Sequence, residues 1–144
     1  MSKRSTPSRK SRLPYLLGVV GVAAAALVFA VSTLGAQASS DASLTTIDVR
    51  ELRQSLAGEI TLLDVREPYE YEAGHVEGAQ LMPLANVVPL AADLPKDQPV
   101  YVVCRSGNRS LQASNALIEA GFQDVRNVDG GMIAWEAAGF DVAR

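Results

Sequence analysis

Short apolar runs alternate with longer amphipathic stretches along the chain from Leu44 onward. Segments 60–63 and 100–103 are short and almost wholly apolar, which predicts strands that are buried on both faces. Segment 125–128 is a further strand candidate, because valines bound it and a Gly-Gly turn follows soon after. The pattern therefore predicts several short buried strands separated by other elements.

Helices are expected in the stretches between these strands. Asp48 is a good N-cap residue, and the stretch after it is helical in pattern through Leu56, with Gly58 ending it. The other predicted helices cover residues 68–72, residues 110–120 and a last stretch through Trp135 to Ala138, whereas residues 84–92 are ambiguous because Pro89 interrupts them. Strands and helices alternating in this way predict an α/β fold with a central, mainly parallel sheet flanked by helices.

The N-terminal part of the chain has a different pattern. Residues 13–36 are uncharged and mostly apolar, long enough to cross a bilayer, which takes about 20 residues. Small residues follow at 36–38, in the spacing that signal peptidases prefer. A retained membrane anchor and a cleaved signal segment are therefore both open. Five basic residues precede the apolar stretch: Lys3, Arg4, Arg9, Lys10 and Arg12.

These features divide the chain into four parts. They are a basic cytoplasmic tip at 1–12, a transmembrane anchor or signal segment at 13–36, a linker at 37–43 and a folded domain at 44–144. Basic residues stay on the cytoplasmic side of a membrane, so the domain is expected on the extracytoplasmic side. It would be anchored there if the leader is retained, and secreted or periplasmic if the leader is cleaved.

Charge and composition exclude several classes of function. The formal net charge is -3, but from residue 13 onward 8 basic residues face 16 acidic ones, a balance of -8 that would repel nucleic acid. The chain has one cysteine, Cys104, and one histidine, His75. These cannot form an internal disulfide or a closed structural zinc site, so neither a metal nor another cofactor is expected.

Cys104 is a candidate nucleophile. It ends an apolar run and begins the loop Arg105-Ser106-Gly107-Asn108-Arg109, which opens a predicted helix. Gly107 lets successive N–H groups converge, and Asn108 tolerates a left-handed turn. Arginines and a helix N-terminus lower the pKa of a thiol from about 8.5 to roughly 3.5–7.5. The alternative is an inert buried cysteine at the end of a strand.

Five motifs occur in an order that resembles the single-domain rhodanese-like sulfurtransferase family. The resemblance covers about residues 44–142, and it implies a three-layer α/β fold around a central parallel sheet, with a catalytic cysteine held by loop amides. The motifs are residues 63–71 (LDVREPYEY), residues 74–79 (GHVEGA), Pro83-Leu84, the Cys104 loop, and Gly130-Gly131 with Trp135 and Gly139.

The resemblance also implies a reaction in two steps. The Cys104 thiolate attacks the outer sulfur of thiosulfate, sulfite leaves, and the persulfide passes its sulfur to cyanide or a thiol. Arg105 and Arg109 would hold the sulfonate oxygens, with Arg109 in a bidentate contact. The amides of loop residues 106–108 would stabilise the persulfide.

The sequence leaves two other functions open. One is a membrane-tethered persulfide relay or sulfur-binding module without turnover of its own. The other is a phosphatase or arsenate reductase, but cysteine phosphatases place their arginine after five intervening residues. In this chain that position is Ser110, whereas only four residues separate Cys104 from Arg109. The shorter loop favours sulfur transfer.

Other polar residues near these motifs are expected to be structural. His75 lies between glycine-rich turns and is expected to bond to backbone rather than to act as a base. Asp64 is expected to order loops, and Arg66 to pair with an acidic neighbour, Glu67 or Glu70. Trp135 is expected to be a core aromatic under the last helix.

Overall fold

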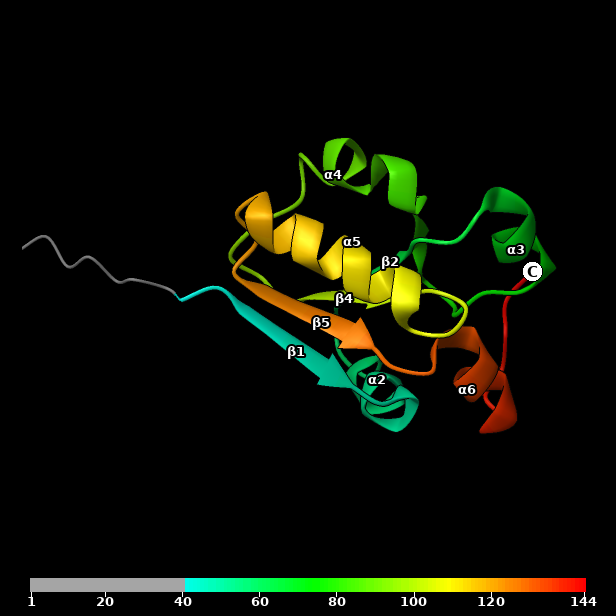
Figure 1. Ribbon diagram of the computed structural model, residues 1–144. Coiled ribbons are helices and arrows are strands. Elements are labelled where there is room, and N and C mark those ends of the chain that lie inside the picture. Colours follow the sequence, from blue (N-terminus) through cyan, green and yellow to red (C-terminus); the bar gives the residue numbers. More distant parts are fainter. Residues whose placement is uncertain (1–40) are drawn as a thin grey trace, which may run out of the picture. The chain divides into compact units, whose positions relative to one another are not determined.

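The computed structural model describes residues 41–144 (Figure 1). The predicted anchor or signal segment at 13–36 lies outside the described residues. Within residues 41–144, no helix is both long enough and apolar enough to cross a membrane.

Five parallel strands form one sheet in the order β1-β5-β4-β2-β3. The predicted strands are confirmed as β2, β4 and β5, each to within one residue. The central strand β4 is buried at all four positions, as its continuous apolar sequence predicts. The bounds are Ser43–Ile47 for β1, Thr61–Asp64 for β2, Gln80–Leu81 for β3, Val100–Val103 for β4 and Asp124–Val128 for β5.

Helices cover both faces of this sheet, so the fold has the three predicted layers (Figure 1). Alternate residues of β4 point to opposite faces. Val100 and Val102 pack with α4 and α5, whereas Tyr101 and Val103 pack with α2 and α6. Trp135 lies in the second of these cores, as expected. The helices are α2 (Val49–Ser55), α3 (Pro68–Ala73), α4 (Val87–Leu90), α5 (Asn108–Glu119) and α6 (Gly131–Ala137).

Several features differ from the sequence expectations. The predicted linker ends too late, because β1 begins at Ser43 and its first amide already bonds to the Gln123 carbonyl at 2.7 Å. The ambiguous region around Pro89 forms a short 3-10 helix, η1 (Leu84–Asn86), followed by α4. Pro89 is accommodated because it lies in the first turn of α4, where its missing N–H would have no helical partner. Strand β3 has only two residues and was not predicted.

Asp48 caps α2 as the sequence predicts. Its carboxylate accepts hydrogen bonds from the amides of Arg50 at 2.7 Å and Glu51 at 2.8 Å, and the Glu51 carboxylate accepts from the Asp48 amide at 2.9 Å. We expect Asp48→Ala to lower the free energy of unfolding by about 1 kcal/mol, measured by urea denaturation. Asp48→Asn, which keeps a capping oxygen, is the control, and equal losses in the two variants would contradict this role.

Candidate active site

The loop that follows β4 is held in place by the first turn of α6. The Met132 amide donates to the Cys104 carbonyl at 2.9 Å, and the Ile133 amide donates to the Arg105 carbonyl at 3.0 Å. A Cβ on Gly131 would lie 2.7 Å from the Arg105 carbonyl carbon and 2.8 Å from its oxygen, so only glycine permits this approach. Because α6 binds two loop carbonyls, it fixes the direction of the peptide groups beside the sulfur.

The other side of the loop faces the Cys104 sulfur. The Gly107 amide lies 3.1 Å from Sγ and donates to it. Gly107 has a φ of 98°, a left-handed conformation that favours glycine, and its carbonyl accepts from the Leu111 amide to begin α5. The Gly107 amide is therefore one backbone donor of the predicted loop that points at the Cys104 sulfur.

The pKa of Cys104 is lowered from the ordinary value of a thiol. Burial raises it, because Cys104 is only 1 % exposed, but hydrogen bonds from Ser110, Ser106 and Gly107 outweigh the burial. The Ser110 hydroxyl has a single proton, and in this geometry it donates to the Gly107 carbonyl at 2.9 Å. Turned toward Sγ instead, this hydroxyl adds the largest single hydrogen bond to those that the backbone amides of Ser110, Ser106 and Gly107 donate to the thiolate.

A lowered thiol pKa predicts a specific pH dependence of alkylation. Iodoacetamide reacts with the thiolate, so its rate with native Cys104 should fall only as the pH drops through the lowered pKa, and the plateau should extend to a lower pH than for an ordinary thiol. The midpoint of this titration should lie below about 8.5, the value of an ordinary thiol. The same chain unfolded in urea is the control, and identical midpoints in the two states would contradict the prediction.

Arg109 is bound by a carboxylate from α3. Its Nη1 and Nη2 lie 2.7 Å and 2.8 Å from the two carboxylate oxygens of Glu70, and the hydrogen bond from Arg109 lowers the pKa of Glu70 to about 2. The bidentate contact that was expected with a sulfonate is therefore made to Glu70. The charge of the Cys104 thiolate contributes to the raised pKa of Arg109, so the guanidinium and the thiolate attract each other.

We expect Glu70→Gln to increase the net positive charge near Cys104. The amide keeps the shape of the carboxylate but no longer neutralises Arg109, so the pKa of Cys104 should fall further. The measurement is again the pH dependence of alkylation. Glu72→Gln on the same helix is the matched control, because Glu72 is exposed. A Cys104 titration that is unchanged in Glu70→Gln would show that Arg109 has no electrostatic effect on the thiol.

The sequence suggested that Arg66 pairs with Glu67 or Glu70, but it pairs with the carboxylate of neither. Its guanidinium binds the Asp64 carboxylate, with Nη2 to Oδ2 at 2.6 Å, and donates to the backbone carbonyls of Glu70 and Gly74. Asp64 is fully buried at the end of β2 and accepts the Arg66 amide as well. This buried pair ties α3 to the end of the sheet, which is the ordering role expected for Asp64.

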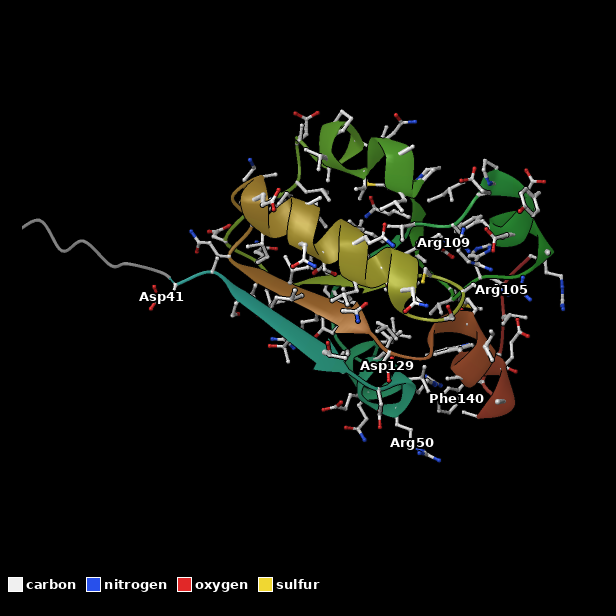
Figure 2. All side chains as sticks on the ribbon, in the orientation of Figure 1. Asp41, Arg50, Arg105, Arg109, Asp129 and Phe140 are labelled. Carbon is white, nitrogen blue, oxygen red and sulfur yellow. The ribbon has the colours of Figure 1, made fainter. Side chains whose placement is uncertain are left out.

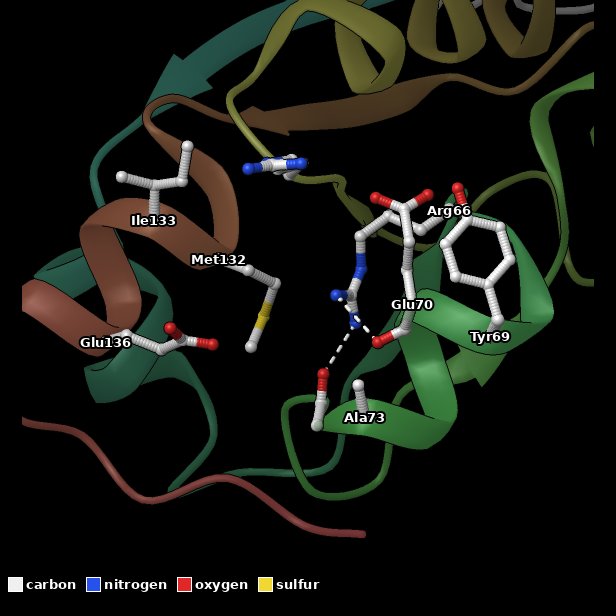
Figure 3. A pocket seen from close by; sticks show the side chains of 9 residues that line it. Arg66, Tyr69, Glu70, Ala73, Met132, Ile133 and Glu136 are labelled. Carbon is white, nitrogen blue, oxygen red and sulfur yellow. Dashed lines mark hydrogen bonds between the residues drawn. The ribbon is translucent and has the colours of Figure 1, made fainter.

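A cavity of about 320 Å³ lies between α3 and α6, beside the Cys104 loop (Figure 3). Figure 2 shows Arg105 and Arg109 together at this end of the domain, near the start of α5. Of the predicted site residues, Arg105 lines the cavity and Ser106 is exposed in the loop. Asn108, which was predicted to lie in the loop, is exposed as the first residue of α5, because that helix begins two residues earlier than expected. The lining residues are Arg66, Tyr69, Glu70, Ala73, Gly74, Arg105, Met132, Ile133 and Glu136.

His75 has the structural role expected for it. Its Nδ1 lies 2.9 Å from the Tyr71 carbonyl oxygen, and its ring stacks on the Tyr71 ring with centroids 3.7 Å apart. Sequence reasoning did not identify Glu70 or Glu136 as members of the site. Glu70 had a signal, because it lies inside the motif at 63–71, whereas nothing in the local sequence singles out Glu136.

Solved structures share this fold. A crystal structure of the Alr3790 protein from Anabaena sp. is 37% identical, with a TM-score of 0.64 over 67% of this chain and 81% of that one. A crystal structure of a rhodanese-like domain protein from Staphylococcus aureus is 29% identical, with a TM-score of 0.62 over 69% of this chain and 99% of that one.

Curated proteins are similar in sequence. A thiosulfate sulfurtransferase, GlpE, from Pseudoalteromonas translucida is 40% identical over 56% of this chain and 76% of its own length. A sulfurtransferase from Allochromatium vinosum is 37% identical over 67% of this chain and 92% of its own length. The chain also matches 26% of the length of MoeZ, a probable adenylyltransferase/sulfurtransferase of Mycobacterium tuberculosis, at 40% identity.

The model of one protein family, the rhodanese-like domain, matches residues 41–138. This match includes all five strands, the Cys104 loop and α6. The family match and the parallel sheet flanked by helices agree with the resemblance that the sequence motifs indicated. The chain therefore belongs to the rhodanese-like domain family.

Proposed function

We propose that this domain is a sulfurtransferase that moves a sulfane sulfur from thiosulfate, or a similar donor, to cyanide or a thiol through a persulfide on Cys104. The observation that carries this proposal is a buried thiol with a lowered pKa that accepts the Gly107 amide at 3.1 Å. The names of the relatives from Pseudoalteromonas translucida and Allochromatium vinosum support the same reaction class.

In the first step, the Cys104 thiolate attacks the outer sulfur of thiosulfate. A new S–S bond forms to Cys104, the S–S bond of thiosulfate breaks, and its electron pair leaves with sulfite. No proton has to move, because sulfite leaves as an anion and the persulfide is itself an anion. The loop amides near Cys104 then stabilise the terminal sulfur as they stabilised the thiolate.

In the second step, the acceptor takes the terminal sulfur. Cyanide attacks it through carbon, a C–S bond forms, the persulfide S–S bond breaks, and the electron pair returns to Cys104 as thiolate. A thiolate acceptor reacts in the same way and leaves as a persulfide. The enzyme ends in its starting state, so the cycle needs no oxidant or reductant.

Arg105 is the guanidinium that we assign to the sulfonate oxygens of the donor. It is exposed, lines the cavity, and forms no ion pair with another residue in 41–144. Arg109, held by Glu70, adds charge and keeps further N–H groups for the donor. The amides of Ser106, Gly107 and Asn108 complete the proposed binding loop.

Mass spectrometry of the full-length chain tests this proposal directly. After treatment with thiosulfate, the protein should gain the mass of one sulfur atom and release an equal amount of sulfite. Adding cyanide should remove that mass and produce thiocyanate. A chain that gains no sulfur from thiosulfate but accepts it from a partner protein would instead support the relay function.

We also propose that the domain works on the extracytoplasmic side of a membrane. The order of basic, apolar and small residues in 1–38 supports this location. Protease added to spheroplasts, whose outer envelope is opened but whose cytoplasmic membrane is intact, should then digest the domain. The mass of the purified chain distinguishes a cleaved leader, which gives an N-terminus near Ser39, from a retained anchor. A domain that is protected until the spheroplasts are lysed would contradict the proposed location.

A further inference from the structure

Four charged side chains line the cavity beside the Cys104 loop, and two of them are already neutralised. Arg66 is bound by the buried carboxylate of Asp64, and Glu70 is bound by Arg109. The other two are Arg105 and Glu136, and neither forms an ion pair within the described part of the chain, 41–144. The cavity therefore holds one free positive and one free negative group.

These two groups come from different elements and do not pair with each other. Arg105 belongs to the loop next to Cys104, whereas Glu136 lies on α6, one turn after Met132. Figure 3 shows the Glu136 carboxylate pointing from α6 into the space between α6 and α3. Both are exposed, so a ligand in the cavity can reach them.

The size of the cavity limits what it holds. A volume of about 320 Å³ is at the small end of the range for small-molecule sites, which begins at about 300 Å³. A ligand of the size of an amino acid or a short peptide fits this space. A carboxylate would be attracted to Arg105 and an ammonium group to Glu136.

We propose that this cavity binds the sulfur acceptor, and that the acceptor is a small thiol carrying both a carboxylate and an ammonium group. The inference rests on the proposed function and names the acceptor class for the same site. Sulfite leaves before the acceptor reacts, so Arg105 can bind the donor sulfonate first and the acceptor carboxylate afterwards. Glu136 acts only on the acceptor, because the donor has no positive group.

The test uses full-length protein in which the Cys104 persulfide has already been formed with thiosulfate and the excess removed. Four thiols are then compared as acceptors: cysteine, cysteamine, 3-mercaptopropionate and 2-mercaptoethanol. The first carries both charges, the next two carry one each, and the last carries none. The rate of sulfur loss is measured for each thiol by mass spectrometry. Each thiol is compared between the original chain and a variant, so differences in thiol acidity cancel.

Glu136→Gln should slow sulfur transfer to cysteine and cysteamine about three- to tenfold, because both lose the partner of their ammonium group. Transfer to 2-mercaptoethanol should not change, and transfer to 3-mercaptopropionate should stay the same or become faster. Glu77→Gln is the matched control, because Glu77 is an exposed acid that lines a different cavity. It should leave all four rates unchanged.

The outcomes separate this inference from the proposed function. If the persulfide forms but Glu136→Gln changes the four rates equally, or changes none of them, the acceptor site is wrong and the sulfurtransferase function stands. If thiosulfate produces no persulfide in the original chain, the proposed function is wrong, and the proposed acceptor class is then wrong as well.

Discussion

Cys104→Ser is expected to abolish the transfer of sulfur from thiosulfate to cyanide, with a loss of at least about four orders of magnitude in kcat/KM. The serine hydroxyl stays protonated at neutral pH, and the loop amides cannot make it a comparable nucleophile. It also cannot form the S–S bond that carries the transferred sulfur. Thiocyanate production measures turnover, and sulfite release measures the first step.

The fold should survive this substitution, which makes the loss of activity informative. Serine differs from cysteine by one atom, and Cys104 is a buried member of the core formed with α4 and α5, directly after the last residue of β4. A melting temperature within a few degrees of the original chain is the control for folding. Turnover within tenfold of the original chain would exclude a persulfide on Cys104 as an intermediate.

The parts of this site that the sequence predicts are those encoded by local patterns. The apolar run at 100–103, the single cysteine after it and Gly107 at the start of a helix all lie within a few residues. A buried parallel strand followed by a helix fixes where the connecting loop lies, at the carboxyl end of the sheet. The position of Cys104 could therefore be predicted without knowledge of any distant contact.

The ion pairs could not be predicted in the same way. Arg66 was expected to pair with an acidic residue that follows it, but its backbone turn brings it back to Asp64, two residues before it. Arg109 and Glu70 are 39 residues apart in the sequence, and they meet only because α3 lies beside the start of α5. Pairing between separate elements depends on tertiary packing, which a local pattern does not contain.

Strand β1 was missed for a related reason. Ser43–Ile47 is exposed at its first four positions and contains no apolar run, so its sequence resembles a linker. It is a strand because it adds to the edge of β5, with Leu44 opposite Val125 and Ile47 opposite Val128. An edge strand of this kind is determined by the partner that it pairs with, and its own sequence carries a weak signal.

Gly131→Ala is expected to have the second largest effect, because it disturbs the loop and the fold together. The added Cβ would meet the backbone of Cys104 and Arg105, and backbone atoms cannot move aside as a flexible side chain can. Either α6 shifts away or the loop does. We expect the free energy of unfolding to fall by about 2–4 kcal/mol in urea denaturation. Persulfide formation should slow about a hundredfold, because the amides near Cys104 lose their alignment.

Gly139→Ala separates this close contact from the backbone conformation. Gly139 has a φ of 75° and Gly131 a φ of 52°, so alanine is strained at both positions, but a Cβ at Gly139 meets no atom within 4 Å. Gly139→Ala should therefore cost only about 1 kcal/mol and leave persulfide formation unchanged. Equal effects of the two substitutions would mean that backbone strain alone explains the loss of stability and rate in Gly131→Ala. A slower reaction confined to Gly131→Ala follows only if the packing of α6 against the loop carbonyls sets the geometry around the sulfur.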